Sequence, residues 1–197
     1  MFYRFKKCGL VGLLVLILFV GISGTANAIP LISLEIDKTL TSLEPDDIVF
    51  VDSLSDAQLY LIVFEHVTNE SGIAWNDFHY TLGYGADDQF VQSEAGDGLG
   101  FVGLSGLLPF GFPVNEVPYS SVFTEYVMYE DTLDWWGGLV PDHGVVDFGI
   151  GILVNNIGVD SFTLREQPSP IPEPATMFLL GSGLVGLAGF RKRFGRK

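Results

Sequence analysis

The sequence predicts a mainly β protein. We expect a single antiparallel β-sandwich, jelly-roll-like, between an N-terminal signal helix and a C-terminal transmembrane helix. Three observations in residues 29–165 favour the sandwich: short apolar runs suited to strands, clusters of Asn, Asp, Gly and Pro between them, and no segment with a convincing helical period. Longer uncharged stretches at the two ends predict the flanking helices.

The first 28 residues have the three parts of a signal peptide. Residues 1–7 carry three positive charges, and the run from Leu10 to Ile22 is apolar. Ala26 and Ala28 then give the small-x-small pattern that signal peptidase accepts. We therefore expect export through the Sec translocon and cleavage after Ala28. An uncleaved signal anchor is the alternative.

The segment between the two ends is strongly acidic. Residues 29–170 hold 23 of the 24 carboxylates and two of the ten Lys and Arg residues, a formal charge of about −21. Such a surface repels nucleic acid and anionic membranes, so we expect no nucleic-acid partner. Solubility is the simplest reason for the charge. The only cysteine, Cys8, precedes the apolar run, so the mature domain would have no disulfide.

The strand predictions rest on alternation and on residue type. Residues 145–154 alternate clearly between large apolar side chains and small or polar ones. Residues 58–67 are apolar on both faces, which is typical of an interior strand. Residues 121–130 are rich in aromatic and β-branched side chains. Shorter strands are expected at 47–51, 77–83, 89–92, 99–104 and 159–165.

The C-terminal region also has three parts. Residues 166–174 read EQPSPIPEP, and such a proline-rich segment favours an extended linker. Residues 175–190 are uncharged. As a helix they would span about 24 Å, short for a hydrocarbon core of roughly 30 Å but able to cross with bilayer thinning. Residues 191–197 carry five positive charges, which favour a cytoplasmic tail with the domain outside the inner membrane. A buried soluble helix is the alternative.

The order of these features resembles a known sorting signal. The tripeptide Pro172, Glu173 and Pro174, the short apolar helix and the basic end resemble the PEP-CTERM signal of Gram-negative bacteria that make extracellular polysaccharide. The resemblance implies a transient inner-membrane anchor and processing at the tripeptide by an exosortase, a membrane-embedded transpeptidase-like cysteine protease. Delivery to the cell surface or extracellular matrix would follow. The resemblance covers 172–197 and implies nothing about the domain's activity.

A second resemblance lies inside the domain. Residues 64–82, FEHVTNESGIAWNDFHYTL, resemble a segment that recurs in exported β domains with this same tail. Asn69 and Gly72 suit a turn between two strands, and Trp75 and Phe78 could clamp that turn onto the core. The resemblance implies a sandwich-like fold and no activity.

Metal sites are weakly indicated. His66 and His79 would face each other if the strands on either side of this turn formed a hairpin, but zinc needs three or four ligands. Asp87, Asp88 and Asp97 crowd a glycine-rich stretch, and calcium prefers carboxylates in flexible loops. The calcium hypothesis stands against the simpler interpretation of solvated acidic loops, and no other cofactor is expected.

Trp135 and Trp136 are the candidate sugar-binding residues. Sugars stack on exposed aromatic rings and hydrogen-bond to nearby acids, and acidic residues flank the pair. The alternative is that one or both tryptophans fill the core, and we expect at least one to do so.

Three functions follow from these features. We prefer a non-enzymatic surface or matrix protein associated with exopolysaccharide. A secreted carbohydrate-active enzyme and a calcium-stabilised carbohydrate-binding module are the alternatives. The sequence contains no Gly-x-Ser-x-Gly, phosphate loop, dinucleotide fingerprint or His-Glu-x-x-His motif, so we expect no enzyme.

Overall fold

A computed structural model describes residues 29–51, 54, 56–105 and 116–170, and the predicted signal peptide, transmembrane segment and basic tail lie outside them. The described chain is mainly β, as predicted. Its elements are β1 (Leu31–Leu40), β2 (Asp46–Val51), β3 (Gln58–Asn69), β4 (Trp75–Tyr84), the 3-10 helix η1 (Asp87–Gln89), β5 (Val91–Gln92), β6 (Leu99–Phe101), β7 (Leu104–Ser105), β8 (Glu116–Val117), β9 (Tyr119–Ser120), β10 (Glu125–Met128), β11 (Thr132–Trp136), β12 (Val145–Asn155) and β13 (Ser161–Pro170).

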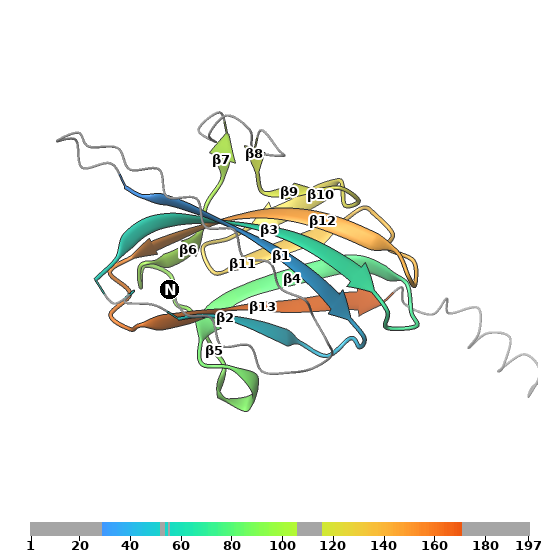
Figure 1. The fold of residues 1–197 in the computed structure, drawn as a ribbon, viewed down its shortest axis with the longest axis horizontal. Coiled ribbons are helices and arrows are strands. Elements are labelled where there is room, and N and C mark those ends of the chain that lie inside the picture. Colours follow the sequence, from blue (N-terminus) through green and yellow to red (C-terminus); the bar gives the residue numbers. More distant parts are fainter. Residues whose placement is uncertain (1–28, 52–53, 55, 106–115, 171–197) are drawn as a thin grey trace, which may run out of the picture.

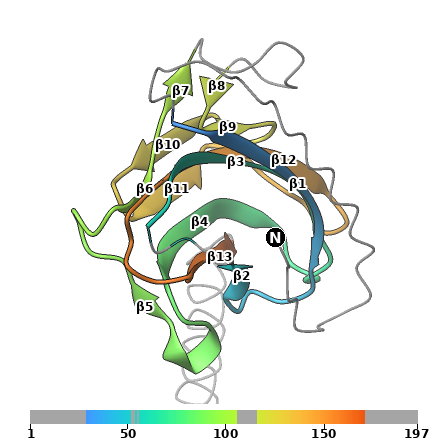
Figure 2. The same cartoon turned by 60° about the vertical axis from the view of Figure 1, so that its left-hand side comes forward.

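The longer strands form two curved layers over one apolar core (Figure 1 and Figure 2). Sheet A has the order β1-β3-β12-β6, with β9 beside β12, and sheet B has the order β10-β11-β4-β13-β2, with β5 beside β4. Aromatic rings join the layers: the ring centroid of Phe148 on β12 lies 4.8 Å from that of Phe78 and 5.3 Å from that of Tyr80, both on β4. Pairs at these separations stabilise a core beyond their buried area.

One strand pair departs from the predicted antiparallel arrangement. β1 and β3 run parallel, from Leu31 opposite Tyr60 to Leu40 opposite Asn69. The strand between them in sequence, β2, belongs to sheet B, so the chain leaves sheet A after β1 and returns to it in the same direction. The expectation of a wholly antiparallel domain is therefore wrong, because sheet A is mixed.

The last strand extends beyond the predicted domain boundary at residue 165. β13 continues to Pro170 and pairs with β4, with Glu166 opposite Tyr80 and Pro168 opposite Phe78. β13 pairs with β2 only as far as Glu166. Pro168 and Pro170 therefore have no neighbouring strand on the β2 side, where their missing amide hydrogens are not needed. Residues 166–170 are thus part of sheet B and not of an extended linker.

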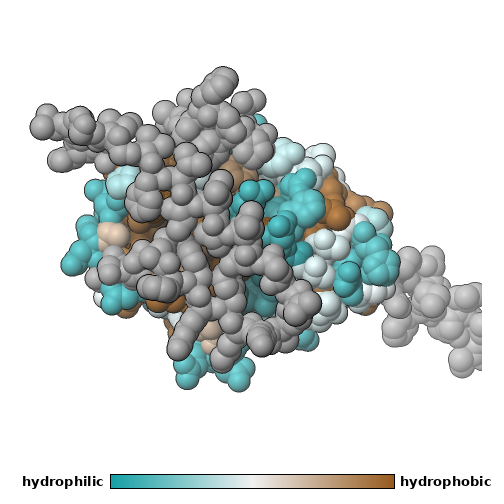
Figure 3. Space-filling view, viewed as in Figure 1, coloured by the Kyte–Doolittle hydropathy of each residue, from teal (hydrophilic) through white to brown (hydrophobic). Residues whose placement is uncertain are grey.

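Part of the outer face of sheet A is covered. A small apolar cluster formed by Ile62, Leu104 and Val117 covers part of sheet A. Gly151 of β12 permits this cover, because a Cβ atom there would lie 2.5 Å from the Val102 carbonyl oxygen. In the view of Figure 3, hydrophilic residues occupy much of the coloured surface, as the acidic composition requires.

Candidate functional site

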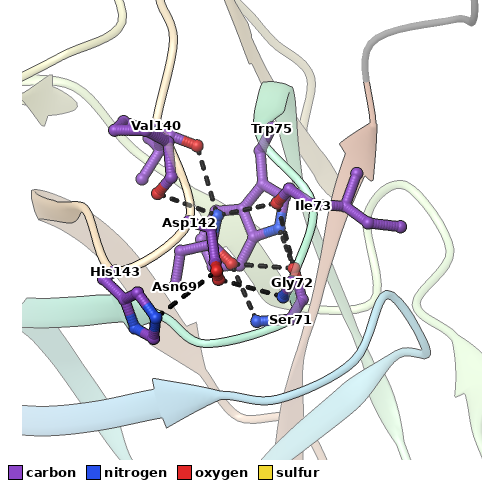
Figure 4. A network of polar contacts seen from close by, with 9 residues as sticks. Asn69, Ser71, Gly72, Ile73, Trp75, Val140, Asp142 and His143 are labelled. Carbon is purple, nitrogen blue, oxygen red and sulfur yellow. Dashed lines mark hydrogen bonds and ion pairs between the residues drawn. The ribbon is translucent and has the colours of Figure 1, made fainter.

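The turn between β3 and β4 is fixed by a buried asparagine (Figure 4). Asn69 Nδ2 lies 2.8 Å from the carbonyl oxygen of Ile73, 3.2 Å from that of Val140 and 3.1 Å from that of Pro141. Asn69 Oδ1 accepts hydrogen bonds from the backbone amide and hydroxyl of Ser71, at 3.0 and 2.7 Å. One side chain thus ties its own turn to the loop before β12.

The neighbours of Asn69 complete this arrangement. Trp75 Nε1 donates to Ser71 Oγ at 3.0 Å, and the Gly72 amide donates to Asp142 Oδ1 at 3.0 Å. Gly72 has a φ of 77°, which glycine adopts without strain. Trp75 and Phe78 are fully buried, with ring centroids 5.8 Å apart. The turn and its aromatic clamp therefore match the sequence-based prediction, and their hydrogen bonds serve structure.

The two histidines on either side of this turn do not face each other. β3 lies in sheet A and β4 in sheet B, so the turn crosses from one layer to the other and forms no hairpin. His66 pairs with Asp147 across sheet A, with Nδ1 and Oδ1 2.5 Å apart, whereas His79 contacts partners on sheet B. The predicted juxtaposition of the two imidazoles is wrong.

His79 instead lies in a row of polar side chains on the outer face of sheet B. It is opposite Asp134 of β11, and its Nδ1 lies 2.8 Å from Asp134 Oδ1. Its Nε2 lies 3.0 Å from Ser169 Oγ of β13. Because an ionised carboxylate only accepts, Nδ1 donates to Asp134, and Nε2 shares the second hydrogen bond with the Ser169 hydroxyl. Three strands thus contribute to one partly exposed polar row.

The two adjacent tryptophans point to opposite faces of β11, as alternation requires. Trp135 is 2% exposed and packs in the core, 6.0 Å between centroids from Phe148. Trp136 is 37% exposed, and its Nε1 donates to Glu125 Oε2 at 2.8 Å. One of the two tryptophans therefore fills the core, as expected, and Trp136 is the candidate that remains for stacking on a sugar. This ring shares the outer face of sheet B with Asp134, two residues before it.

Comparison with known proteins finds a sorting signal that begins at the last residue of β13. The model of the PEP-CTERM protein-sorting motif matches residues 170–193, which include Pro172, Glu173 and Pro174. The chain carries a PEP-CTERM sorting domain. The motif implies that an exosortase sorts this PEP-CTERM protein to the cell surface. Neither a curated protein nor a solved structure matches the chain.

The tail of the PEP-CTERM protein lies outside the described residues, as do Ala26 and Ala28 of the predicted cleavage site. Across the ranges that the structure describes, no helix is long and apolar enough to cross a membrane.

The calcium candidates of the PEP-CTERM protein do not converge. Asp97 holds its own loop, accepting from Tyr84 Oη at 3.0 Å, Ser93 Oγ at 2.9 Å, and the amides of Glu94 and Leu99. Burial raises the pKa of Asp97, but these donors, the Leu99 amide foremost, outweigh burial and lower it overall.

Asp87 and Asp88 are exposed residues of η1. The backbone amide of Asp87 donates to Asp47 Oδ2 at 2.7 Å. Among the described residues, no group of three or more His, Cys, Asp or Glu side chains is placed to hold a metal ion.

Arg165 fastens η1 to sheet B. Its Nε and Nη2 donate to the two carboxylate oxygens of Asp47 at 2.7 and 2.8 Å, and its guanidinium lies 3.9 Å from the ring centroid of Phe90. Burial raises the pKa of Asp47, but the hydrogen bonds from Arg165 and from the Asp87 amide outweigh it and lower the pKa. A bidentate pair of this kind fixes both position and orientation.

This pair predicts an acid-sensitive stability. Because the folded-state pKa of Asp47 lies below its ordinary value of 3.8, ionised Asp47 stabilises the fold above that value. The contribution is lost as the pH falls through the folded-state pKa. The melting temperature of the wild type should therefore fall more steeply than that of Asp47→Asn between about pH 5 and about pH 2. Asp88→Asn, at an exposed position, should follow the wild-type curve; parallel curves for all three proteins would contradict this assignment.

Proposed function

We propose that this PEP-CTERM protein is a non-enzymatic surface or matrix component whose domain is a jelly-roll-like β-sandwich that binds extracellular glycan. Signal peptidase removes residues 1–28 after Sec export, and residues 175–190 anchor the chain in the inner membrane with the basic tail in the cytoplasm. Exosortase then acts at Pro172, Glu173 and Pro174, and the domain reaches the surface or matrix of a Gram-negative bacterium. The sorting motif, together with the apolar and charged segments of the sequence, supports this route.

One observation carries the glycan proposal: an exposed indole ring shares a sheet face with a row of hydrogen-bonding side chains. Trp136 offers an apolar surface, and the row of His79, Asp134 and Ser169 offers donors and acceptors at fixed positions. A sugar ring needs both, because its C–H face packs on an aromatic ring while its hydroxyls exchange hydrogen bonds. The hydrogen bond from Trp136 to Glu125 orients the indole in advance of binding.

The charge of the domain narrows the glycan class. With a formal charge of about −21 over 29–170, the surface repels a polyanionic polysaccharide at long range. Carboxylates such as Asp134 accept hydrogen bonds from neutral hydroxyls without that penalty. The preferred ligand is therefore a neutral or sparsely charged polysaccharide.

Binding to purified neutral extracellular polysaccharide tests the proposal. Trp136→Ala should lower affinity about tenfold, because loss of one aromatic stacking contact costs about 1.4 kcal/mol. Tyr129→Ala removes a more exposed aromatic ring outside the row and should bind like the wild type. Isothermal titration of full-length protein in detergent measures both. If the wild type and Trp136→Ala bind with equal affinity, Trp136 does not contact the glycan. If Trp136→Ala and Tyr129→Ala lose affinity equally, the protein adheres to the polysaccharide nonspecifically.

A specific geometry favours a second candidate, a serine hydrolase acting on ester groups of a polysaccharide. The order Ser169 Oγ, His79 Nε2, His79 Nδ1 and Asp134 Oδ1 is that of a nucleophile, its base and the group that orients the base. We rank it second because Ser169 is flanked by Pro168 and Pro170, which have no amide hydrogen. The residue after the serine therefore cannot help to stabilise an oxyanion.

The Ser169→Ala variant separates the two candidates. A hydrolase should lose nearly all release of acyl groups, whereas a binding module should release no acyl groups even as the wild type and should lose part of its glycan affinity in the variant. Ester release by the wild type that Ser169→Ala abolishes would replace the binding proposal with the enzymatic one.

A further inference from the structure

Three charged side chains occupy core-facing positions between the sheets. Lys38 of β1 follows the buried Leu34 and Ile36 in the inward phase of its strand, and Glu65 of β3 lies between the buried Val63 and Val67. Glu166 takes the corresponding inward position on β13. The Glu65 residue is 2% exposed, Glu166 is fully buried, and the Lys38 side chain is 11% exposed. Charges at such depth occur only with strong partners.

The three side chains meet. Lys38 Nζ lies 3.0 Å from Glu166 Oε2 and 2.8 Å from Asp46 Oδ2. Tyr80 Oη donates to Glu65 Oε2 at 2.7 Å, which fixes that carboxyl group. The amine nitrogen of Lys38 is thus in contact with the carboxyl group of Glu166, and Glu65 adjoins the same group.

Ionising the carboxyl groups of Glu65 and Glu166 together costs free energy, because two like charges then lie close together in the core. Burial foremost, and then the charge of Glu65, raises the pKa of Glu166, which favours the protonated form of the Glu166 carboxyl group. Burial lowers the pKa of Lys38, but Glu166, Glu65 and Asp46 outweigh burial and raise it overall, so the amine rests as an ammonium ion. Glu65 Oε1 and both carboxyl oxygens of Glu166 accept no well-aligned hydrogen bond among the described residues. The desolvation of such a buried ion pair costs free energy that opposes folding.

We propose that Lys38 and Glu166 condense to an intramolecular isopeptide bond, with Glu65 as the catalytic residue that transfers the protons. Figure 1 shows the two strands that it would join, β1 and β13, running toward the same side of the molecule. They are the first and the last strands of the described domain, and they belong to different sheets.

The step balances without any co-reactant. The ammonium proton passes to the carboxyl pair, and the neutral Lys38 Nζ then attacks Cδ of the protonated Glu166. Glu65 supplies its proton to the departing hydroxyl of Glu166, which leaves as water, and the resulting Glu65 carboxylate takes a proton from the attacking nitrogen. The products are one amide, one water molecule and a protonated Glu65 that keeps its hydrogen bond with Tyr80.

Two physical reasons favour this reaction at this place. Contact between the reacting groups replaces a bimolecular encounter, and the apolar core limits access of the water that would reverse the step. The product also replaces a buried ion pair by neutral groups. The domain has no intramolecular disulfide, because Cys8 is the only cysteine of the chain.

Mass spectrometry of the mature protein from its native host tests the proposal. With both termini mapped in the same sample, the intact mass should be lower than the sequence requires by one water molecule. Proteolysis should release a branched peptide that links Lys38 to Glu166. A folded wild-type protein with the full mass and no branched peptide overturns the proposal, whatever its glycan binding.

Substitutions assign the roles. Lys38→Arg should restore the full mass, and Glu166→Gln should lose one ammonia in place of one water. Glu65→Gln keeps the size of the side chain but not its proton transfer, so it should retain the full mass, whereas Glu35→Gln, exposed on β1, should stay cross-linked. Circular dichroism checks that each variant is folded. A water loss that persists in Lys38→Arg places the modification elsewhere and overturns the assignment.

Discussion

Deletion of residues 172–197 from this PEP-CTERM protein is expected to abolish its processing and its delivery to the cell surface. The deletion removes the tripeptide that an exosortase would recognise and the uncharged segment that would present it at the membrane. Without this segment nothing retains the exported chain at the inner membrane, so the domain should accumulate in soluble form outside it. Sequencing of both mature termini, with cell fractionation, measures the effect.

A single substitution sharpens the test. Glu173→Gln leaves the apolar segment and the basic end intact, so the chain should still be anchored but should stay uncleaved at its C-terminus. Glu44→Gln, at an exposed position of the domain, serves as the matched control and should mature normally. Normal maturation and location of the deletion variant would refute exosortase-dependent sorting of this chain.

The largest expected effect on folding comes from Asn69→Ala. The substitution removes the hydrogen bonds of Asn69 to the carbonyl oxygens of Val140 and Pro141 and to the Ser71 amide in a buried turn. The two carbonyl oxygens keep their backbone donors, whereas the Ser71 amide loses its acceptor. Each lost hydrogen bond costs on the order of 1 kcal/mol, so the free energy of unfolding should fall by about 3 kcal/mol. The melting temperature should fall by roughly 10 °C.

Thermal and urea unfolding measure this loss. Glu70→Ala, one residue later and exposed, should change the free energy of unfolding by less than about 0.5 kcal/mol. Equal stability of Asn69→Ala and Glu70→Ala would show that water replaces the lost amide and that the turn does not depend on Asn69.

Local alternation predicted the interior of the fold well but not its pairing. Residues 58–67 and 145–154 form β3 and β12, which lie side by side in sheet A. The first segment is apolar on both faces, and the second alternates between large apolar and small or polar residues, so each pattern is readable locally. The parallel β1–β3 pair depends on β2 entering the other sheet, a nonlocal choice with no signature in any single segment.

Two of the strands that the sequence pattern did not predict, β1 and β11, share one cause. β1 carries Lys38 at a core-facing position, which breaks the apolar alternation. β11 contains Asp134 next to two tryptophans. An acidic residue beside adjacent aromatic residues predicts a loop with exposed rings as readily as a strand. The polar partners that justify these residues come from distant strands, so only the folded structure reveals them.

The same reason explains the candidate sites. Trp136 was identifiable because exposed aromatic residues flanked by acids are conspicuous in sequence. Ser169 was not, because a proline-rich segment predicts a linker, whereas β13 holds it in a sheet beside His79. The sequence does contain one signal for the buried cluster of Lys38, Glu65 and Glu166. It is a charged residue in the inward phase of an otherwise apolar strand, as at Lys38 and Glu65.

The extension of β13 to Pro170 restricts how the C-terminus can be cut. A single residue separates the paired strand from Pro172, so even a fully extended chain places the tripeptide within about 7 Å of the sheet. A membrane protease must then either dock against the end of the folded domain or draw out the final residues of β13, where the register with β4 shifts between Ser169 and Pro170. A covalent link at Glu166 would stop such peeling there and limit the usable tether to residues 167–171.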